Sequence, residues 1–325
     1  MKNREEHMTK VAMIGTGLIG RSWAIVFARA GHEVALWDPE SKALSEALAF
    51  IAARLPELAE AQLLRGQTPA AVHGRLHPAA TLAEALAGAV YVQESGPERL
   101  PEKMALFQQM DELADPTTIL ASSTSTIRTS LFSENLKGRS RCLVAHPVNP
   151  PYLIPLVELS PAPWTDEVVV EQARKFMQSA GMVTALVKRE IEGFLLNRLQ
   201  AALITEALYL VEQGYADPAD IDATVKDGLG LRWSFMGPFE TIDLNAPGGL
   251  ADYAARYGHL FQSMMAASEP PSWSHGFIDQ LQETRRAELP MSAHPDRQVW
   301  RDRRLMALLA HKASQTKATM SASHD

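Results

Sequence analysis

One histidine and one glutamate stand out mid-chain because each lies in an otherwise apolar segment. The segment AHPVNPPYLIPLVEL, residues 145–159, places His146 twelve positions before Glu158. If antiparallel strands flank NPP, the two side chains come side by side. A carboxylate bonded to one imidazole nitrogen fixes the tautomer and makes the other nitrogen a general base. The pattern predicts proton transfer at a substrate hydroxyl. The alternative is a hydrogen-bonded core histidine, with Glu158 paired to an arginine.

A glycine-rich turn near the N-terminus predicts a dinucleotide site. The turn GTGLIG, residues 15–20, directly follows the apolar run KVAMI, and Asp38 closes the next apolar run. Such glycines allow a tight turn and a close approach of the pyrophosphate to a helix N-terminus. Asp38 would accept from ribose hydroxyls and repel a 2′-phosphate, which favours NAD over NADP. FAD uses the same turn, and glycines that serve only a turn are the structural alternative. The predicted cofactor-binding residues of the turn are Gly15, Gly17, Leu18, Ile19 and Gly20.

The elements that position these residues follow from the alternation of short apolar runs and longer amphipathic runs over the first 190 residues. This alternation predicts a parallel sheet covered by helices, with His146 at the carboxyl end of a strand, where such sheets bind ligands. From Glu192 onward the spacing is helical. We therefore predict a Rossmann-type NAD-binding domain over residues 1–192 and an all-α domain over residues 193–325. The polar, aperiodic tail from about residue 311 to 325 is expected to be frayed.

Composition excludes several classes of function. The chain has 325 residues, 46% of them hydrophobic, and a net charge of −7. Nucleic acid is not an expected partner, because phosphate binding needs a basic surface. No signal peptide and no run of eighteen apolar residues occurs, so no membrane partner is expected. The single cysteine, Cys142, is typical of a reducing compartment, and we expect a cytoplasmic protein without a metal site.

Several ordered motifs carry a resemblance to a known family. They are GTGLIGRSWAIVFARAGHEVALWD, QESGPERLPEK, ASSTS, AHPVNPPYLIPLVEL, EGFLLNRLQ and GLGLRWSFMGPFETIDLN. With these motifs the chain resembles the 3-hydroxyacyl-CoA dehydrogenase family from Val11 to about Tyr257, and most of all its lambda-crystallin or L-gulonate 3-dehydrogenase branch. The resemblance implies an NAD-dependent dehydrogenase that forms a homodimer through its helical domain.

The resemblance also implies roles for individual residues. His146 matches the general acid/base and Glu158 its orienting carboxylate, while Ser125 and Asn197 match residues that hold the reacting substrate oxygen. On the residues themselves, Ser125 would be an ordinary turn hydroxyl and Asn197 a helix-start residue. Glu98 and Lys103 match family positions near the nicotinamide and its ribose. The alternative is that they form a solvated ion pair at the start of a helix.

The substrate is predicted from the second domain. Arg232 in GLRWSF could clamp a carboxylate, or could serve a structural pair. Trp233, Phe235 and Phe239 could wall a pocket for a quaternary-ammonium hydroxy acid, although aromatics at this spacing are more often core. The segments GLRW and GPFET resemble the gulonate branch more than the short-chain acyl-CoA enzymes. This resemblance implies oxidation of the 3-hydroxyl of a small, L-gulonate-like hydroxy acid to the 3-keto acid. A 3-hydroxyacyl-CoA such as 3-hydroxybutyryl-CoA, a carnitine-type hydroxy acid, and a crystallin-like NAD-binding structural protein stay open as alternatives.

Overall fold

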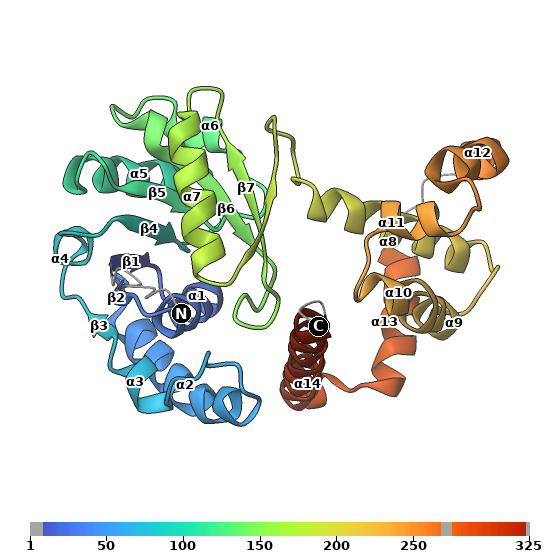
Figure 1. Ribbon diagram of the computed structural model, residues 1–325, viewed down its shortest axis with the longest axis horizontal. Coiled ribbons are helices and arrows are strands. Elements are labelled where there is room, and N and C mark those ends of the chain that lie inside the picture. The colour runs from blue at the N-terminus through green and yellow to red at the C-terminus, as the bar shows by residue number, and fades with distance from the viewer. Residues whose placement is uncertain (1–8, 268–274, 323–325) are drawn as a thin grey trace. The chain divides into compact units, whose positions relative to one another are not determined.

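The computed structural model describes residues 9–267 and 275–322 (Figure 1). The chain forms two compact units, one of residues 1–196 and 296–325 and the other of residues 197–295. The sequence instead predicts one boundary after Glu192. The C-terminal segment belongs with the first unit because Met306 is buried in that unit's core, with Leu305 and Leu309 packed against it.

The first unit is built on an eight-stranded sheet in the order β3-β2-β1-β4-β5-β6-β7-β8 (Figure 1). All neighbouring strands are parallel except β6 and β7, which pair antiparallel. The predicted Rossmann-type sheet followed by a helical domain is confirmed. The strands are β1 Lys10–Ile14, β2 Glu33–Trp37, β3 Leu76–Pro78, β4 Tyr91–Glu94, β5 Ile119–Ser122, β6 Cys142–Pro147, β7 Leu156–Pro161 and β8 Val183–Leu186.

Helices cover both faces of this sheet, and β1 shows why. Val11 and Met13 belong to one buried cluster with Phe27 of the first helix, while Ala12 and Ile14 belong to the other cluster. Successive strand residues point to opposite faces, so a strand buried on both faces is apolar throughout. The helices of this unit are α1 Leu18–Arg29, α2 Ser41–Glu60, α3 Pro69–His73, α4 Leu82–Leu86, α5 Leu100–Leu113, α6 Thr129–Ser133 and α7 Glu167–Ser179, with most of α14 His294–Ala322.

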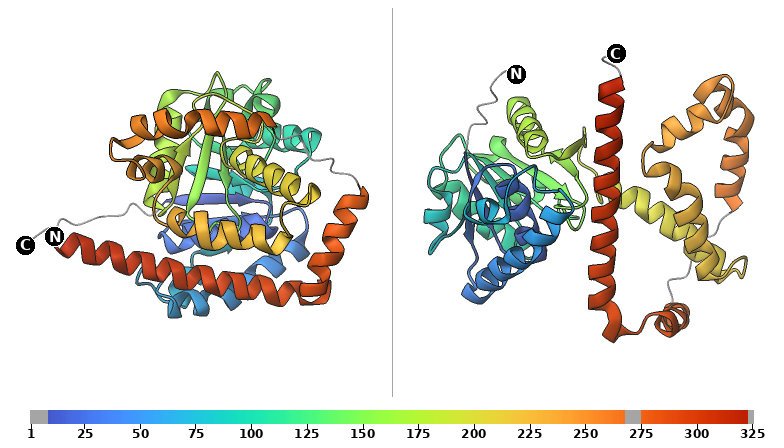
Figure 2. Two further views of the ribbon diagram at one scale, coloured as in Figure 1. Left: turned by 90° about the vertical axis from the view of Figure 1, so that its right-hand side faces the viewer. Right: turned by 60° about the horizontal axis from the view of Figure 1, so that its bottom comes forward.

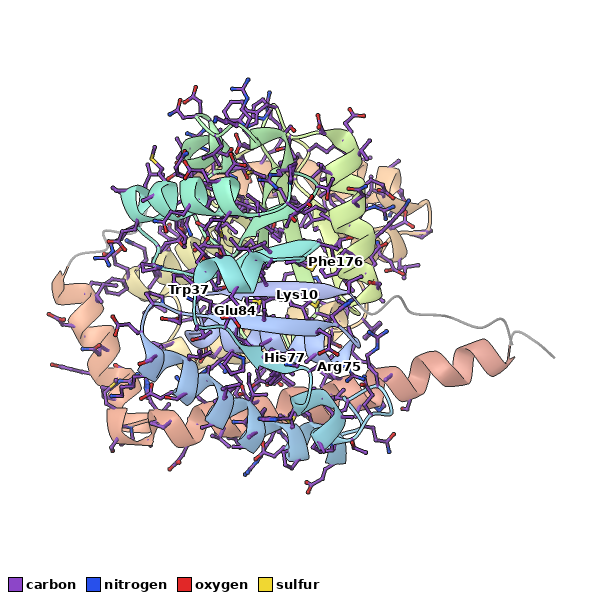
Figure 3. All side chains as sticks on the ribbon, turned by 90° about the vertical axis from the view of Figure 1, so that its left-hand side faces the viewer. Lys10, Trp37, Arg75, His77, Glu84 and Phe176 are labelled. Atoms are coloured by element: carbon purple, nitrogen blue, oxygen red, sulfur yellow. The ribbon has the colours of Figure 1, made fainter. Side chains whose placement is uncertain are left out.

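Side-chain contacts of β1 and β2 attach two short elements, α4 and β3, to the rest of the unit. Figure 3 labels Lys10 of β1 close to Glu84 of α4, and the Lys10 ammonium donates to the Glu84 carbonyl at 2.9 Å. On β3, which the sequence did not predict, the His77 ring pairs with the carboxylate of Glu33 on β2. Three residues are too few to show a strand period, so hydrophobic patterning does not predict β3.

The tail differs from its prediction. α14 continues to Ala322 (Figure 2), so the segment predicted to be frayed from residue 311 is helical over residues 311–322. The reason is propensity: the segment HKASQTKATMSA contains three alanines and two lysines, and these are strong helix formers even without an apolar stripe.

The second unit is helical. It contains α8 Leu196–Glu212 from its second residue onward, α9 Pro218–Ala223, a π-helical segment Thr224–Leu229, α10 Gly230–Trp233, α11 Pro238–Leu244, α12 Gly249–Ala267 and α13 His275–Glu288. Within the described ranges, no helix is long and apolar enough to cross a membrane.

Candidate active site

The three glycines of the turn between β1 and α1 have different surroundings. Gly15 has φ +89°, and a Cβ placed on it would lie 2.7 Å from the Ser95 carbonyl oxygen. A Cβ on Gly20 would lie 1.9 Å from the Gly15 carbonyl oxygen, whereas a Cβ on Gly17 would meet nothing within 4 Å. Gly15 and Gly20 therefore close the turn. Gly17 leaves open space at the N-cap of α1, where the free N–H groups of a helix attract a phosphate.

Asp38 lies just beyond β2 and bonds to the glycine turn. Its Oδ2 accepts from the Thr16 backbone N–H at 2.7 Å and from the Thr16 hydroxyl at 3.1 Å. Its Oδ1 accepts from the Glu40 backbone N–H at 3.0 Å. Two carboxylate oxygens offer about four acceptor positions, so three bonds leave room for one more donor. The carboxylate is held beside the turn and retains capacity for a ribose hydroxyl.

His146 and Glu158 lie side by side, as the antiparallel arrangement of β6 and β7 requires. They are register partners, and His146 Nδ1 lies 2.9 Å from Glu158 Oε2. The second carboxylate oxygen, Oε1, accepts from the backbone N–H groups of Leu195 at 2.8 Å and Leu196 at 2.9 Å. Burial raises the pKa of the Glu158 carboxyl, but the bonds from His146, Leu196 and Leu195 outweigh burial and hold that pKa below its usual range. The carboxylate is therefore ionised at neutral pH.

A strained turn supplies these two backbone donors. Gly193 has φ +75° and Phe194 has φ +52°, a conformation that is uncommon for a residue other than glycine. The Phe194 ring is fully buried, with its centroid 5.4 Å from that of the His146 ring. The turn thus directs two N–H groups at Glu158 and packs an apolar ring against His146. Sequence reasoning missed this turn, although Gly193 in EGFLLNR was a signal for positive φ just before a helix.

Ser125 lies in a loop that is organised by Glu98. Glu98 Oε1 accepts from the Thr124 hydroxyl at 2.5 Å, from the Ser125 backbone N–H at 3.0 Å and from the Thr126 backbone N–H at 3.1 Å. Partial burial raises the pKa of the Glu98 carboxyl, but the bonds from Thr124 and Thr126 and the nearby charge of Lys103 lower it further than burial raises it. An ionised Glu98 therefore fixes the backbone of the loop that presents Ser125.

Lys103 is not half of a solvated ion pair with Glu98. Its side chain is 1% exposed, and its ammonium donates to Glu94 Oε2 at 2.7 Å. The Ser122 hydroxyl donates to the same oxygen at 2.6 Å. The alternative of a solvated pair is therefore wrong for Lys103. Sequence reasoning missed Glu94 because its motif, QESG, gives no indication of which cation packs against the carboxylate.

Comparison with known proteins identifies the family. Residues 10–191 match "3-hydroxyacyl-CoA dehydrogenase, NAD binding domain", and residues 193–288 match "3-hydroxyacyl-CoA dehydrogenase, C-terminal domain". The chain belongs to the 3-hydroxyacyl-CoA dehydrogenase family. It is an NAD-dependent oxidoreductase, and the open space above Gly17 beside the Asp38 carboxylate fits that cofactor.

Individual members of the family show the range of likeness. The chain is 41% identical over 311 residues to the lambda-crystallin homolog of Bos taurus, covering 94% of this chain and 97% of that one. It is 39% identical over 275 residues to L-carnitine dehydrogenase of Streptomyces griseus, covering 84% and 81%. Among solved structures, 3-hydroxybutyryl-CoA dehydrogenase of Escherichia coli K12 is 32% identical with a TM-score of 0.66, covering 82% of this chain and 55% of that one.

The remaining predicted residues of this family member lie in the helical unit. Asn197 is the first residue of that unit. Arg232 is exposed, and its Nη1 lies 3.5 Å from the neutral Asn245 Oδ1, a weak contact at the limit of hydrogen bonding. The aromatics after it are not core, because Phe235 and Phe239 are 67% and 75% exposed and Trp233 is 40% exposed. The described residues contain no group of three or more His, Cys, Asp or Glu side chains that could hold a metal ion.

Proposed function

We propose that the protein oxidises the 3-hydroxyl of a small hydroxy acid to the 3-keto acid, with His146 as the general base. The main support is the way in which the Glu158 carboxylate is held, which we call the Glu158 clamp. One oxygen accepts from two backbone N–H groups and the other lies 2.9 Å from His146 Nδ1. A structural ion pair needs no such clamp. The clamp serves a group that must keep one orientation while the imidazole gains and loses a proton.

The proton path follows from the tautomer. An ionised carboxylate can only accept, so His146 Nδ1 carries the proton that lies between it and Glu158. In the neutral imidazole Nε2 is then the unprotonated nitrogen, which can take the proton of the substrate hydroxyl. The adjacent carboxylate stabilises the imidazolium that forms, as in other acid/base pairs of this kind. In the reverse direction the same nitrogen returns the proton to the keto oxygen.

The cofactor supplies the other half of the reaction. When bound, NAD would supply the acceptor for the hydride of the carbon that carries the substrate hydroxyl. This chain's part is to hold the pyrophosphate over Gly17, to bind the adenosine ribose through Asp38 and to hold the nicotinamide half beside Glu98. Lys103 is buried against Glu94 and acts through its charge on Glu98. We further propose that the Ser125 hydroxyl and the Asn197 amide bind the reacting oxygen. The role of Ser125 is supported by the hydrogen bond from its backbone N–H to Glu98 Oε1, which fixes the loop that carries the Ser125 hydroxyl.

The substrate that we propose is a free, L-gulonate-like hydroxy acid whose carboxylate binds Arg232. The identity of 41% to the lambda-crystallin homolog, against 32% to 3-hydroxybutyryl-CoA dehydrogenase, supports the lambda-crystallin or L-gulonate branch over an acyl-CoA enzyme. Arg232 is exposed and touches a neutral amide, so its guanidinium can take a carboxylate without first breaking a strong ion pair.

A substrate panel tests the proposal. NADH formation would be measured with L-gulonate, L-carnitine and 3-hydroxybutyryl-CoA at equal concentrations. We expect the highest kcat/KM for the free sugar acid. A preference for the thioester would reject the free-acid proposal, and a preference for carnitine would place a quaternary ammonium in the pocket.

A second test separates an enzyme from a structural NAD-binding protein. His146→Ala should bind NADH with unchanged affinity and lose turnover by about 10² to 10⁴, the usual contribution of a positioned acid/base group. If NADH binds tightly while the wild type oxidises no hydroxy acid in a broad panel, the crystallin-like alternative replaces the catalytic one.

We also propose that the protein is a cytoplasmic homodimer. Support for a second copy comes from large apolar side chains left exposed on the helical unit, where Leu199, Leu231 and Leu244 are each about two-thirds exposed. Light scattering after size-exclusion chromatography should give twice the chain mass of 35.7 kDa; the mass of one chain would reject the dimer. The cytoplasm is supported by Cys142, a free and buried thiol, and cell fractionation tests it.

A further inference from the structure

A chain of polar side chains runs from the core beneath β4 to the glycine turn. Trp23 Nε1 donates to Ser123 Oγ at 3.1 Å, and Gln93 Nε2 donates to the same oxygen at 2.7 Å. Ser123 Oγ lies 2.9 Å from Ser95 Oγ. Trp23, Gln93 and Ser123 are all buried. The proposed catalytic residues include none of these four, so their arrangement needs another explanation.

Two groups with a single hydrogen-bonding role, the Trp23 indole N–H and the Ala145 carbonyl, determine which atom donates in each of these hydrogen bonds. The Ala145 carbonyl can only accept, so the Gln93 side-chain atom that lies 3.2 Å from it is the amide nitrogen. The Trp23 indole can only donate. Ser123 Oγ therefore accepts two hydrogen bonds, which uses both of its acceptor positions. Its own proton must go to Ser95 Oγ.

Ser95 is consequently left with a proton to donate, and it lies against the cofactor turn. It directly follows β4, and its backbone N–H donates to the Ile14 carbonyl at 2.7 Å. A Cβ placed on Gly20 would lie 3.5 Å from Ser95 Cβ, and one on Gly15 would meet the Ser95 backbone. Ser95 is only partly buried. Its hydroxyl proton is thus available at the turn over which the pyrophosphate is proposed to lie.

We propose that the Ser95 hydroxyl donates a hydrogen bond to an oxygen of NAD, either on the pyrophosphate or on the ribose that carries the nicotinamide. Trp23, Gln93 and Ser123 act as positioning residues that keep Ser95 in the donor state. A hydroxyl that already points its proton toward the site binds an anionic oxygen more tightly, because it loses no rotational freedom and breaks no other hydrogen bond when the cofactor binds. The inference rests on the proposed cofactor position and is independent of the substrate.

Cofactor affinity tests the role of Ser95. Ser95→Ala should weaken NADH binding by roughly tenfold or more, the effect of removing a hydrogen bond to a charged group. Ser95→Cys retains a weak donor of similar shape and should give an intermediate affinity. Ser45→Ala, at an exposed serine whose hydroxyl bonds only the Lys42 carbonyl in α2, should bind as the wild type does. Fluorescence titration measures all four proteins, with melting temperature as the check on folding.

Fragments of the cofactor locate the accepting oxygen. If affinity for ADP falls with affinity for NADH, the acceptor is on the pyrophosphate. If affinity falls for ADP-ribose and NADH but not for ADP, the acceptor is on the ribose. A folded Ser95→Ala protein that binds NADH within twofold of the wild type overturns the proposal, as does an equal loss of affinity for adenosine, which carries no phosphate. A wild type that does not bind NADH would instead reject the proposed function itself.

Ser123→Ala tests the positioning residues. The variant leaves the Trp23 and Gln93 donors without their acceptor and allows the Ser95 hydroxyl to turn away. We expect a lower melting temperature and a loss of NADH affinity smaller than that of Ser95→Ala. Full NADH affinity in this variant would overturn the positioning role.

Discussion

Glu158 Oε2 lies 2.9 Å from His146 Nδ1, and the other oxygen of the same carboxylate is held by two backbone N–H groups. The two residues are direct partners across the only antiparallel step in the sheet that the structure describes. A parallel neighbour would need a long crossover, whereas an antiparallel return needs only the eight residues between β6 and β7. The antiparallel step therefore places a base and its carboxylate twelve positions apart on one short segment.

Glu158→Gln should reduce kcat by about 10³ to 10⁴ while NADH affinity stays within twofold. The N–H groups of Leu195 and Leu196 require an oxygen at the position of Oε1, so the new amide NH₂ must face His146 Nδ1. Nδ1 then becomes an acceptor, the proton moves to Nε2, and the base is lost by a change of tautomer, as when the triad aspartate of serine proteases is replaced by asparagine. Steady-state NADH formation measures the effect. A fall in kcat of less than tenfold would contradict the proposed tautomer.

The same residue should make stability depend on pH in a defined range. The folded protein holds the pKa of Glu158 below its usual range, so the carboxylate stabilises the fold above the unfolded-state pKa of about 4.3 and loses that effect as the pH falls through the folded-state pKa. The difference in melting temperature between the wild type and Glu158→Gln should be full at pH 7 and shrink below about pH 4.3. Calorimetry across this range measures it; a constant difference would be the contrary result.

Asp38→Asn should shift cofactor preference toward NADPH. The asparagine retains one oxygen for the Thr16 N–H, which Asp38 binds at 2.7 Å, but loses the charge that repels a 2′-phosphate. We expect the ratio of the NADPH Kd to the NADH Kd to fall by about tenfold or more, since a charge pair a few ångströms apart is worth about 1 to 4 kcal/mol near a protein surface. Parallel titrations with both cofactors measure the ratio. An unchanged ratio would mean that Asp38 does not face the 2′ position.

Cys142 should not react with thiol reagents in the native protein. Burial raises the pKa of the Cys142 thiol to about 12, with the nearby Asp111 carboxylate adding to the effect. Only the thiolate reacts, and at pH 8 its fraction is then about 10⁻⁴. A colorimetric thiol assay should detect no reactive group in the folded protein and one per chain in guanidinium chloride. Rapid labelling of the native chain would show that the strand around Cys142 opens.

The sequence predicts the parts of the site that depend on spacing and misses those that depend on the backbone. Spacing predicts the glycine turn that begins at Gly15, and it predicts that His146 and Glu158 lie side by side. Both predictions depend on local properties, namely the period of a strand and the short connection between two antiparallel strands. Spacing cannot predict the Leu195 and Leu196 donors, because nearly every residue has a backbone N–H group. Which of them point at Glu158 depends on the backbone conformation, not on residue type. Spacing also missed the pairing of Lys103 with Glu94, since the choice of carboxylate depends on packing between α5 and β4.

Two glycine variants separate a structural glycine from one that makes room for the cofactor. Gly20→Ala would place its Cβ 1.9 Å from the Gly15 carbonyl oxygen, so the turn must open, and both melting temperature and NADH affinity should fall. Gly17→Ala meets nothing within 4 Å, and its φ of −61° suits alanine. Its melting temperature should match the wild type while NADH binding weakens by at least tenfold, because its methyl group fills the space proposed for the pyrophosphate. Thermal melts and fluorescence titrations of both variants give the comparison. A Gly17→Ala protein with full NADH affinity would show that the pyrophosphate lies elsewhere.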